Sequence, residues 1–508
     1  MARNLGDMLD ARRAPDKIVL IETEADGAST RSSWTARALD DLIDAAARGL
    51  LKRGLRRGDS VGIMSLNRTE FVAAYFGAMR AGLVAVPINW KLPADTVAYI
   101  AEDARVKLLF VDAERMGLAP AGLDVIDFDA SSWSSFLDPG PFESIEPDSD
   151  EVAQILYTSG STGRPKGVPL SHAGQRWAVE VASTEDVSAH RLLVAAPMFH
   201  MNALINLKFA FHNKACAVLM PMFSARSYIA AIEAHDITWL TSVPTMLAMV
   251  AKEIGDGPVP DAFARVTRVF MGSSPFGQSL LDRVRKLFPN AVVTNGYGTT
   301  EAGPAVFGRH PAGLPTPDLS MGYPLSGVDV RIVDPDGRVL EGPGEGVLQM
   351  RTPALMAGYL NRPDQTARAM RDGWYHSNDI VRRDADGFYT FVGRADDMFV
   401  SGGENIYPGE VEKLLERCRG VQQAVVVPVP DEVKQALPFA FVVREPGAAG
   451  AIIDEADIKR WALEHGPAYQ HPRWVEFVDA MPLAGTNKID RAALKQRAAE
   501  IASRRGRG

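Results

Sequence analysis

The segment Tyr157 to Gly167, with the sequence YTSGSTGRPKG, has the residue types of a polyphosphate-binding loop. Glycines let the backbone approach an anion closely, so that its N–H groups can point at the anion. Short hydroxyl side chains add donors, and Lys166 adds a positive charge. Because Pro165 precedes this lysine, the segment differs from the P-loop G-x-x-x-x-G-K-[ST], which runs into a helix. The candidate phosphate ligands are Thr158, Ser159, Gly160, Ser161, Thr162, Gly163 and Lys166.

A second segment, Asn295 to Glu301 with the sequence NGYGTTE, suits a nucleotide. Glycines on both sides of Tyr297 allow its ring to stack on a flat base while the backbone stays close. The two threonines offer hydroxyls to a phosphate, and Glu301 can hold a magnesium ion. Further along the chain, the carboxylate of Asp379 can accept hydrogen bonds from two ribose hydroxyls at once. The candidate nucleotide ligands in the first segment are Asn295, Gly296, Tyr297, Gly298, Thr299 and Thr300.

The elements around these segments predict an α/β protein. Apolar, strand-like runs alternate with helical patterns from about residue 30 to 330. This alternation predicts parallel sheets covered by helices, in which ligands gather at the carboxyl ends of strands. Strands over residues 153–157 and 291–294 would place both segments at such ends. Further elements expected here are strands over 192–196, 237–240 and 266–271, and a helix over 276–288.

The pattern of polar and apolar residues changes after about residue 325. Residues 328–333 alternate between polar and apolar side chains, and the turn residues 335–337 follow them, so we predict a small antiparallel β region. A last α+β segment begins near Asp396. It should contain a helix over 408–418, opened by a proline and closed by Gly420, and strands over 424–429 and 439–443.

Composition excludes several classes of protein. The chain has 508 residues and a net charge of −8, which argues against a nucleic-acid-binding protein. Its two cysteines, Cys216 and Cys418, exclude a disulfide framework and a four-cysteine zinc site. We expect a cytoplasmic protein, because no signal core, no apolar run long enough to span a bilayer and no S-K-L ending is found.

Together these motifs resemble the adenylate-forming superfamily, which includes acyl- and aryl-CoA synthetases, the adenylation domains of peptide synthetases and luciferases. The resemblance extends from Leu51 to Leu494, and the motifs occur in the family's order. It implies a large N-terminal adenylation domain over residues 1–395 and a small, mobile α+β C-terminal domain over residues 396–508. It also implies ATP, Mg²⁺ and coenzyme A, the last as a substrate.

The resemblance also assigns roles to individual residues. Asp379 and Arg394, in the segments GWYHSND and GFYTFVGR, correspond to the family's ribose-binding pair, although Ser377–Asn378 stands where the family commonly has Thr-Gly. Thr158 and Glu301 become magnesium ligands. The residues expected against the other side of the adenine are Gly272, Ser273 and Ser274.

The C-terminal motifs imply a movable lid. Asp396 corresponds to the hinge, and Ser401, Gly402 and Gly403 resemble the segment that lines the pantetheine tunnel. Lys488, in PLAGTNKIDRAAL, corresponds to the catalytic lysine, although Asn487 replaces the usual glycine before it. A lysine between a carboxylate and the α-phosphate stabilises the negative charge that builds on both in the transition state.

The segment APMFHMNA, which follows a predicted strand, resembles the acid-binding part of acyl- and aryl-CoA synthetases. In these enzymes an aromatic residue at the position of His200 gates the carboxylate site, and His200 joins Lys488 and Glu301 among the expected catalytic residues. We find no aspartate that would hold a substrate ammonium, and an uncompensated ammonium in a dry pocket is costly, which argues against an amino-acid substrate. The candidate pocket-lining residues are His200, Met201, Asn202, Gly296 and Ala302.

The implied function is that of an AMP-forming acid–CoA ligase. A carboxylic acid and Mg·ATP would give an acyl-adenylate and pyrophosphate, and the thiol of CoA would then give acyl-CoA and AMP after rotation of the C-terminal domain. Likeness to 4-coumarate-type ligases favours an aromatic, arylpropenoic or medium-chain acid. Two alternatives stay open: transfer of the acyl group to an amine or carrier protein, and a non-catalytic nucleotide-binding homologue. Whether the protein is a monomer or a homodimer also stays open.

Overall fold

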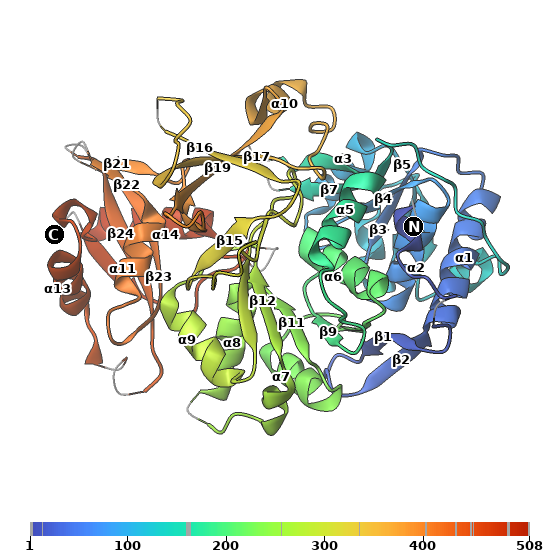
Figure 1. The fold of residues 1–508 in the computed structure, drawn as a ribbon, viewed down its shortest axis with the longest axis horizontal. Coiled ribbons are helices and arrows are strands. Elements are labelled where there is room, and N and C mark those ends of the chain that lie inside the picture. The colour runs from blue at the N-terminus through green and yellow to red at the C-terminus, as the bar shows by residue number, and fades with distance from the viewer. Residues whose placement is uncertain are drawn as a thin grey trace.

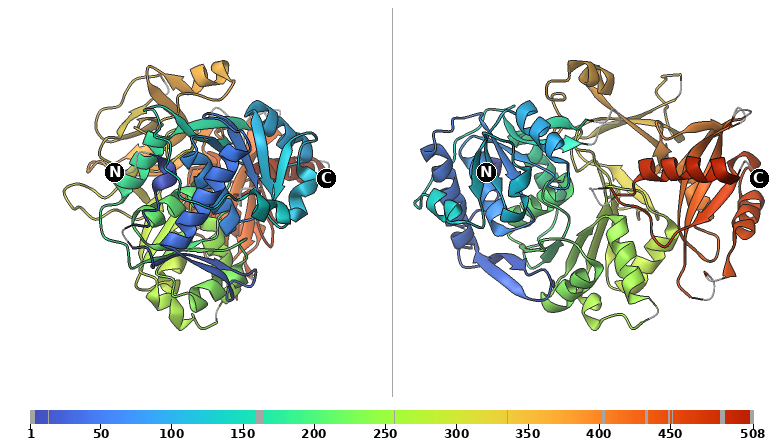
Figure 2. Two further views of the ribbon diagram at one scale, coloured as in Figure 1. Left: turned by 90° about the vertical axis from the view of Figure 1, so that its right-hand side faces the viewer. Right: turned by 180° about the vertical axis from the view of Figure 1, so that it is seen from behind.

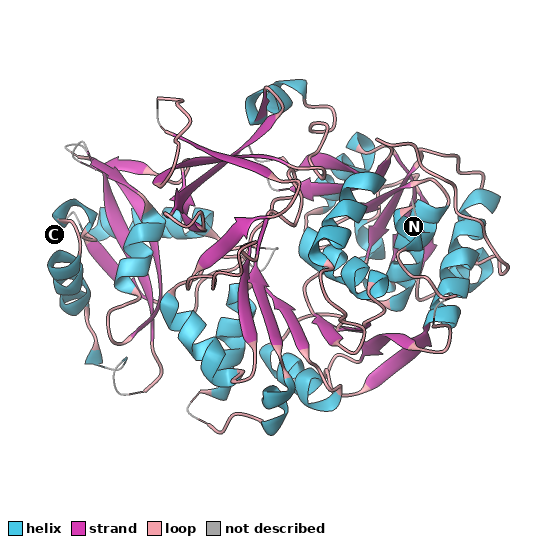
Figure 3. Cartoon of the chain, viewed as in Figure 1, coloured by secondary structure: helices cyan, strands magenta, loops and turns pink. Residues whose placement is uncertain are grey.

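The computed structural model describes residues 4–12, 14–158, 164–255, 257–334, 336–401, 404–431, 434–447, 450, 452–484 and 488–505. Figure 1 shows that the N-terminal part lies at one end of the long axis and the C-terminal part at the other. Strands form the interior of each part and helices lie on the outside (Figure 3). Among the described helices, none is both long and apolar enough to cross a membrane.

The first sheet has the strand order β6-β5-β3-β4-β7-β8 and is parallel except for its last pair, β7 with β8. Its strands are β3 (Ser60–Met64), β4 (Val84–Pro87), β5 (Val106–Val111), β6 (Asp124–Asp127), β7 (Val152–Thr158) and β8 (Lys166–Ser171). The helices of this part are α1 (Ala36–Lys52), α2 (Thr69–Arg80), α3 (Ala94–Asp103) and α4 (Ser131–Phe136). Helix α2 is buried on all sides, as expected for a helix that is apolar around most of its surface.

The second sheet has the order β13-β12-β11-β9-β10-β1-β2 and is parallel except for the pair β1 with β2. Its strands are β1 (Ile18–Thr23), β2 (Thr30–Thr35), β9 (Arg191–Val194), β10 (Cys216–Leu219), β11 (Trp239–Ser242), β12 (Arg268–Gly272) and β13 (Val292–Gly296). Its helices are α5 (His172–Ala182), α6 (Met201–His212), α7 (Ala225–Ala234), α8 (Pro244–Ile254) and α9 (Gln278–Leu287).

The third sheet is antiparallel, with the order β14-β15-β20-β19-β17-β16 and β18 paired with β19. Its strands are β14 (Phe307–Gly308), β15 (Ser320–Pro324), β16 (Asp329–Val333), β17 (Gly344–Arg351), β18 (Met370–Arg371), β19 (Trp374–Arg383) and β20 (Tyr389–Arg394), with helix α10 (Pro363–Ala369) inserted before β18. This sheet confirms the antiparallel β region expected after residue 325.

The fourth sheet, of order β22-β21-β24-β23 with β25 beside β24, lies in the C-terminal part. Its strands are β21 (Phe399–Ser401), β22 (Glu404–Ile406), β23 (Val421–Asp431), β24 (Gln435–Arg444) and β25 (Trp474–Phe477). The helices are α11 (Pro408–Leu415), α13 (Glu455–His465) and α14 (Arg491–Arg505), and α14 crosses this sheet in the view from behind (Figure 2). The hydrophobic clusters of this part contain only residues from Phe399 onward.

The structure corrects some element boundaries. The strand expected over 237–240 is β11, which begins at Trp239 and ends at Ser242. The helix expected over 408–418 ends at Leu415, because the backbone tightens there into a turn in which the Cys418 N–H donates to the Leu415 carbonyl. The α/β fold class predicted from the sequence is confirmed by the two largely parallel sheets and the helices that cover them.

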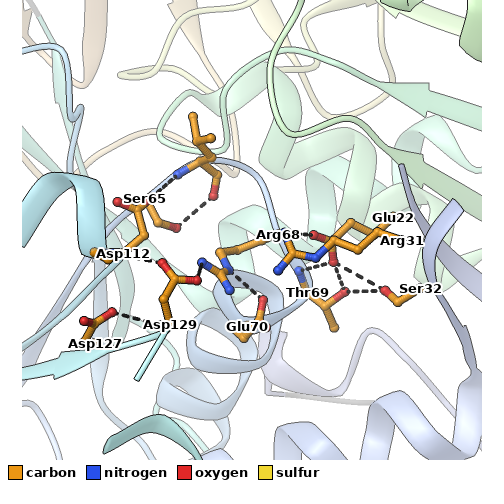
Figure 4. Close-up of polar contacts among 12 residues, drawn as sticks. Glu22, Arg31, Ser32, Ser65, Arg68, Thr69, Glu70, Asp112, Asp127 and Asp129 are labelled. Carbon is orange, nitrogen blue, oxygen red and sulfur yellow. Dashed lines mark hydrogen bonds and ion pairs between the residues drawn. The ribbon is translucent and has the colours of Figure 1, made fainter. Parts of the chain in front are cut away.

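A buried asparagine joins the carboxyl ends of the two parallel sheets. The amide nitrogen of Asn67, just after β3, donates to the carbonyls of Ala196 (2.9 Å) and Met220 (3.0 Å), and its oxygen accepts from the Met198 N–H (2.8 Å). Figure 4 shows the adjoining contacts, in which Arg68 lies between two carboxylates. The strand end before His200 is therefore fixed relative to the first sheet.

His172, the first residue of α5, makes the fold sensitive to acid. It is buried, its Nδ1 accepts from the Leu5 N–H at 3.0 Å, and burial lowers its pKa to about 4. Below its ordinary pKa of 6.5 the unfolded chain binds a proton that the folded chain does not. The free energy of unfolding therefore decreases as the pH is lowered from 6.5 to about 4.

We therefore expect the free energy of unfolding of His172→Gln to decrease less than that of the parent when the pH is lowered from 6.5 to 5. The difference between the two proteins should grow by about 1.4 kcal/mol for each pH unit. Urea unfolding of both proteins across this range measures the difference, and the exposed His465→Gln serves as control. Parallel stability curves for His172→Gln and the parent would contradict this account.

Candidate active site

The candidate residues meet in one cavity of about 1560 Å³. Its walls come from the carboxyl ends of β12 and β13, the end of β7, the first half of β19 and the C-terminal part of the chain. The predicted residues that line it are Thr158, Lys166, His200, Met201, Asn202, Gly272, Ser273, Ser274, Asn295, Gly296, Tyr297, Gly298, Thr299, Thr300, Glu301, Asp379, Arg394, Asp396 and Lys488. The strand ends therefore gather side chains that are far apart in the sequence.

Not every predicted residue lines this cavity. Ala302, expected in the acid pocket, is fully buried, and its carbonyl accepts from the Thr352 hydroxyl instead of facing the cavity. Ser401, expected in the pantetheine tunnel, is buried at the end of β21. The predicted residues Ser159, Gly160, Ser161, Thr162, Gly163, Gly402 and Gly403 lie outside the described residues.

One end of the cavity suits a magnesium polyphosphate. Thr158 ends β7, and its buried hydroxyl has no hydrogen-bond partner among the described residues. Lys166 begins β8 and places Nζ 4.4 Å from the centre of the Tyr359 ring. The hydroxyl of Tyr359 donates to Glu301 Oε1 at 3.0 Å, which fixes this carboxylate. A hydroxyl, one carboxylate and phosphate oxygens form the oxygen-rich set that Mg²⁺ prefers, so these residues fit the ion.

Asp379 lies in the same cavity and is held by two donors. Arg394 Nη1 donates to Asp379 Oδ1 at 3.1 Å, and the hydroxyl of Tyr297 donates to Oδ2. Burial raises the pKa of Asp379, whereas Arg394 and the Tyr297 hydroxyl lower it. The sequence predicted that Tyr297 would stack on a base. It did not reveal the contact with Asp379, because the two residues are 82 positions apart.

The departure from Thr-Gly before Asp379 has a local explanation. Asn378 has φ of +60°, in the left-handed region that favours glycine and, among other residues, asparagine. The Ser377 hydroxyl donates to the Leu348 carbonyl at 2.7 Å and accepts from the Asp379 N–H at 3.0 Å. Ser377–Asn378 thus supplies both the hydroxyl and the backbone conformation that this irregular point within β19 requires, where the pairing with β17 shifts register.

Lys488 enters the cavity from the loop before α14. Solvent reaches its side chain through the cavity, but the surrounding protein and the nearby Arg394 guanidinium lower its pKa. Asp379 and Glu301 act in the opposite direction. The ammonium therefore lies close enough to interact electrostatically with both Asp379, the candidate ribose ligand, and Glu301, the candidate metal ligand.

His200 caps the N-terminus of α6, and its Nε2 is buried without a hydrogen-bond partner among the described residues. Burial, together with the nearby charges of Lys488 and Lys91, lowers its pKa to about 3. The ring packs edge-on against Phe199, with centroids 4.5 Å apart. The imidazole is therefore uncharged at neutral pH and offers a polar edge next to Lys488 without adding charge to the site.

Gly296 is required by the packing of Phe270. A Cβ at Gly296 would lie 1.8 Å from Cζ of the Phe270 ring, which lines the cavity next to it. We expect Gly296→Ala to push this ring into the acid-binding space and to lower kcat/KM for the acid by at least about tenfold. ATP affinity should change by less than about twofold.

Steady-state kinetics with either substrate varied would measure both effects. The double variant Gly296→Ala/Phe270→Leu should recover part of the loss, because the shorter side chain leaves room for the new methyl group. An equal loss of ATP affinity in Gly296→Ala would contradict this role.

The C-terminal part contacts the second sheet next to the cavity. Glu416, just after α11, packs against Gly277, the residue before α9: a Cβ on Gly277 would lie 2.1 Å from Glu416 Oε2. The enclosing protein raises the pKa of Glu416 to about 8. Lys252 Nζ adds a bond to the Asp479 carbonyl at 2.8 Å. Nothing in the sequence signalled these contacts, because they join surfaces that are remote along the chain.

The sequence matches the models of two families: AMP-binding enzyme over residues 9–360 and AMP-binding enzyme C-terminal domain over residues 410–488. Feruloyl-CoA synthase of an Amycolatopsis species is 33% identical over 481 residues, covering 92% of this chain and 94% of that protein. Fatty acid–[acyl-carrier-protein] ligase ScoC of Streptomyces coeruleorubidus is 32% identical, covering 89% of each chain.

Solved structures agree with these relatives. The anthranilate CoA ligase AuaEII in complex with anthranoyl-AMP superposes with a TM-score of 0.87 at 25% identity, covering 98% of both chains. ATP-bound MatB from Rhodopseudomonas palustris gives a TM-score of 0.88 at 25% identity, covering 99% of this chain and 100% of that one. With its cavity residues, its fold and both family matches in agreement, the chain belongs to the AMP-binding enzymes of the adenylate-forming superfamily.

Proposed function

We propose that this AMP-forming acid–CoA ligase activates an aromatic, arylpropenoic or medium-chain carboxylic acid. One observation carries the assignment of the site: Lys488 lies in the same cavity as His200, Glu301 and Asp379, which come from three different parts of the chain. In this arrangement an acid carboxylate beside His200 would meet the α-phosphate of ATP next to the ammonium.

The first half-reaction then follows from the geometry. A carboxylate oxygen attacks the α-phosphorus, the bond to the bridging oxygen of pyrophosphate breaks, and the products are the acyl-adenylate and pyrophosphate. Lys488 stabilises the charge on the attacking and phosphoryl oxygens, which is largest in the transition state. Asp379 would accept hydrogen bonds from the ribose hydroxyls. Thr158 and Glu301 would hold Mg²⁺, and the bound ion would supply positive charge that offsets the charge of pyrophosphate.

The second half-reaction requires Lys488 to leave the acyl-adenylate. We assign the hinge to Asp396, which accepts from Arg394 Nε at 2.9 Å at the border between the third and fourth sheets. Residues 1–395 then form the large domain and residues 396–508 the lid, which agrees with the separate hydrophobic clusters from Phe399 onward. Attack of the CoA thiol on the acyl carbon releases AMP and gives the thioester.

A second molecule is a candidate for the acyl acceptor besides CoA. ScoC, named as a fatty acid–[acyl-carrier-protein] ligase, is about as similar to this chain as feruloyl-CoA synthase is. A carrier-protein thiol is therefore the second candidate acceptor.

A cytoplasmic location accords with both acceptors and with the two free, buried thiols of Cys216 and Cys418.

Release of AMP from ATP, measured over a panel of acids with and without CoA, tests the proposal. The panel runs from acetate and malonate through octanoate to benzoates and cinnamates. CoA-dependent release with aromatic or medium-chain acids is expected. Pyrophosphate exchange that is indifferent to CoA would favour a carrier protein or amine, and no release with any acid would overturn the ligase assignment.

A further inference from the structure

The cavity continues beyond the adenylate site along the face of the second sheet. Arg268, Phe270 and Gly272 alternate along β12, and all three line it. Side chains two residues apart share one face of a strand, so the cavity follows this strand from its carboxyl end at Gly272 to its amino end at Arg268, about 13 Å at the usual rise per residue. The opposite wall is one face of α6, with Met201, Asn202, Ile205 and Phe209. We call this extension the acid channel.

Trp239, the first residue of β11, lines the far end of the acid channel beside Arg268, its partner in the sheet. Its ring packs against Phe209, with centroids 5.5 Å apart, and edge-on against His190 at 5.4 Å. The indole N–H is buried and has no acceptor among the described residues. Buried indole N–H groups normally find a partner, and an unpaired one is unfavourable. A bound molecule can supply the missing acceptor.

The charges at this end favour a neutral acceptor. Arg268 donates to Glu185 Oε2 at 2.7 Å, and Arg309 donates to Oε1 of the same carboxylate at 3.4 Å. The Arg268 guanidinium lies 5.8 Å from the centre of the Trp239 ring. Because this arginine is already paired, a second carboxylate entering here would compete with Glu185 and lose its own hydration. A hydroxyl or ether oxygen can accept from the indole N–H without that cost.

We propose that Trp239 determines specificity by donating a hydrogen bond to a neutral oxygen at the end of the acid remote from its carboxylate. The inference rests on the proposed function and narrows its substrate class. A ring-oxygenated arylpropenoic acid and a medium-chain acid with a terminal hydroxyl both have this shape. The aromatic walls formed by Phe270 and Phe209 accommodate either.

The test compares acids that differ only in the remote oxygen. The pairs are cinnamate with para-coumarate, and decanoate with its terminally hydroxylated form, together with the dicarboxylate of the same length. Trp239→Phe keeps an aromatic ring and removes the N–H donor. Trp374→Phe makes the same change on the third sheet, outside the cavity, where Trp374 stacks with Arg331 and Arg351.

The parent and Trp374→Phe should prefer the oxygenated acid of at least one pair by about tenfold in kcat/KM, the effect of one buried neutral hydrogen bond. Trp239→Phe should remove this preference by lowering kcat/KM for the oxygenated acid, with the oxygen-free acid changed by less than about twofold. An equal loss for both acids, a preference that survives in Trp239→Phe, or a parent that prefers the oxygen-free acid or the dicarboxylate would overturn the inference while leaving the ligase assignment intact. A parent inactive with every acid would overturn both.

Discussion

Replacing Lys488 with alanine is expected to slow acyl-adenylate formation by about 10²–10³-fold, the usual effect of removing a donor that stabilises a transition-state charge. The ammonium lies in the cavity with Asp379 and Glu301, where the carboxylate and the α-phosphate would meet. Thioester formation from supplied acyl-adenylate should be spared, because in the proposed mechanism the lid would have rotated Lys488 away before that step. Pyrophosphate exchange measures the first step, and consumption of acyl-adenylate by CoA measures the second.

Lys495 provides a matched control, since it is an exposed lysine on α14, close to Lys488 in the chain. Lys495→Ala should leave both half-reactions unchanged. An equal loss in the two half-reactions of Lys488→Ala would indicate a structural role and would contradict the alternation of lid positions.

The second large effect is expected for Asp379→Asn, which should lower kcat/KM for ATP by about 10²-fold. The amide cannot accept from two ribose hydroxyls as a carboxylate does, and it removes one of the two carboxylates that pair with the Arg394 guanidinium, leaving only Asp396. The ratio of kcat/KM for ATP to that for dideoxy-ATP isolates the ribose contact. It should be large in the parent and close to one in Asp379→Asn.

Asp386→Asn, an exposed change in the turn between β19 and β20, is the control for this variant. Thermal unfolding of both proteins separates lost binding from lost folding. A parent that does not discriminate between the two nucleotides, or an Asp379→Asn variant that discriminates as strongly as the parent, would contradict a ribose-binding role.

Much of the fold and the site could be predicted because their signals are local. Alternating strands and helices predicted the parallel sheets, and the rule that ligands gather at strand ends located the nucleotide segment after β13. The motif around Lys488 predicts that this lysine belongs to the site, although Asn487 replaces a glycine there, and the structure places Lys488 in the cavity. Even the unusual Asn378 has a local cause, since its φ of +60° suits asparagine.

Other features depend on contacts between distant segments. Tyr297 meets Asp379 only because β13 and β19 come together, and Trp239 reaches the acid channel because β11 pairs with β12. Ala302 shows the opposite case, because its place beside Glu301 suggested exposure to the pocket, whereas the loop turns it into the core. Which face of a loop is buried depends on packing, which a motif does not encode.

The contact between Glu416 and Gly277 has a consequence for proton balance. In the observed arrangement the pKa of Glu416 is about 8, so the carboxyl is protonated at pH 7. Lid rotation would expose it and restore its ordinary pKa of 4.5, so each opening would release a proton and each closure would take one up. Between pH 4.5 and about 8, each increase of one pH unit would favour the open lid over the closed lid by about 1.4 kcal/mol. The balance between the two half-reactions would thus depend on pH through Glu416, a side chain at the border of the cavity that belongs to none of the candidate catalytic residues.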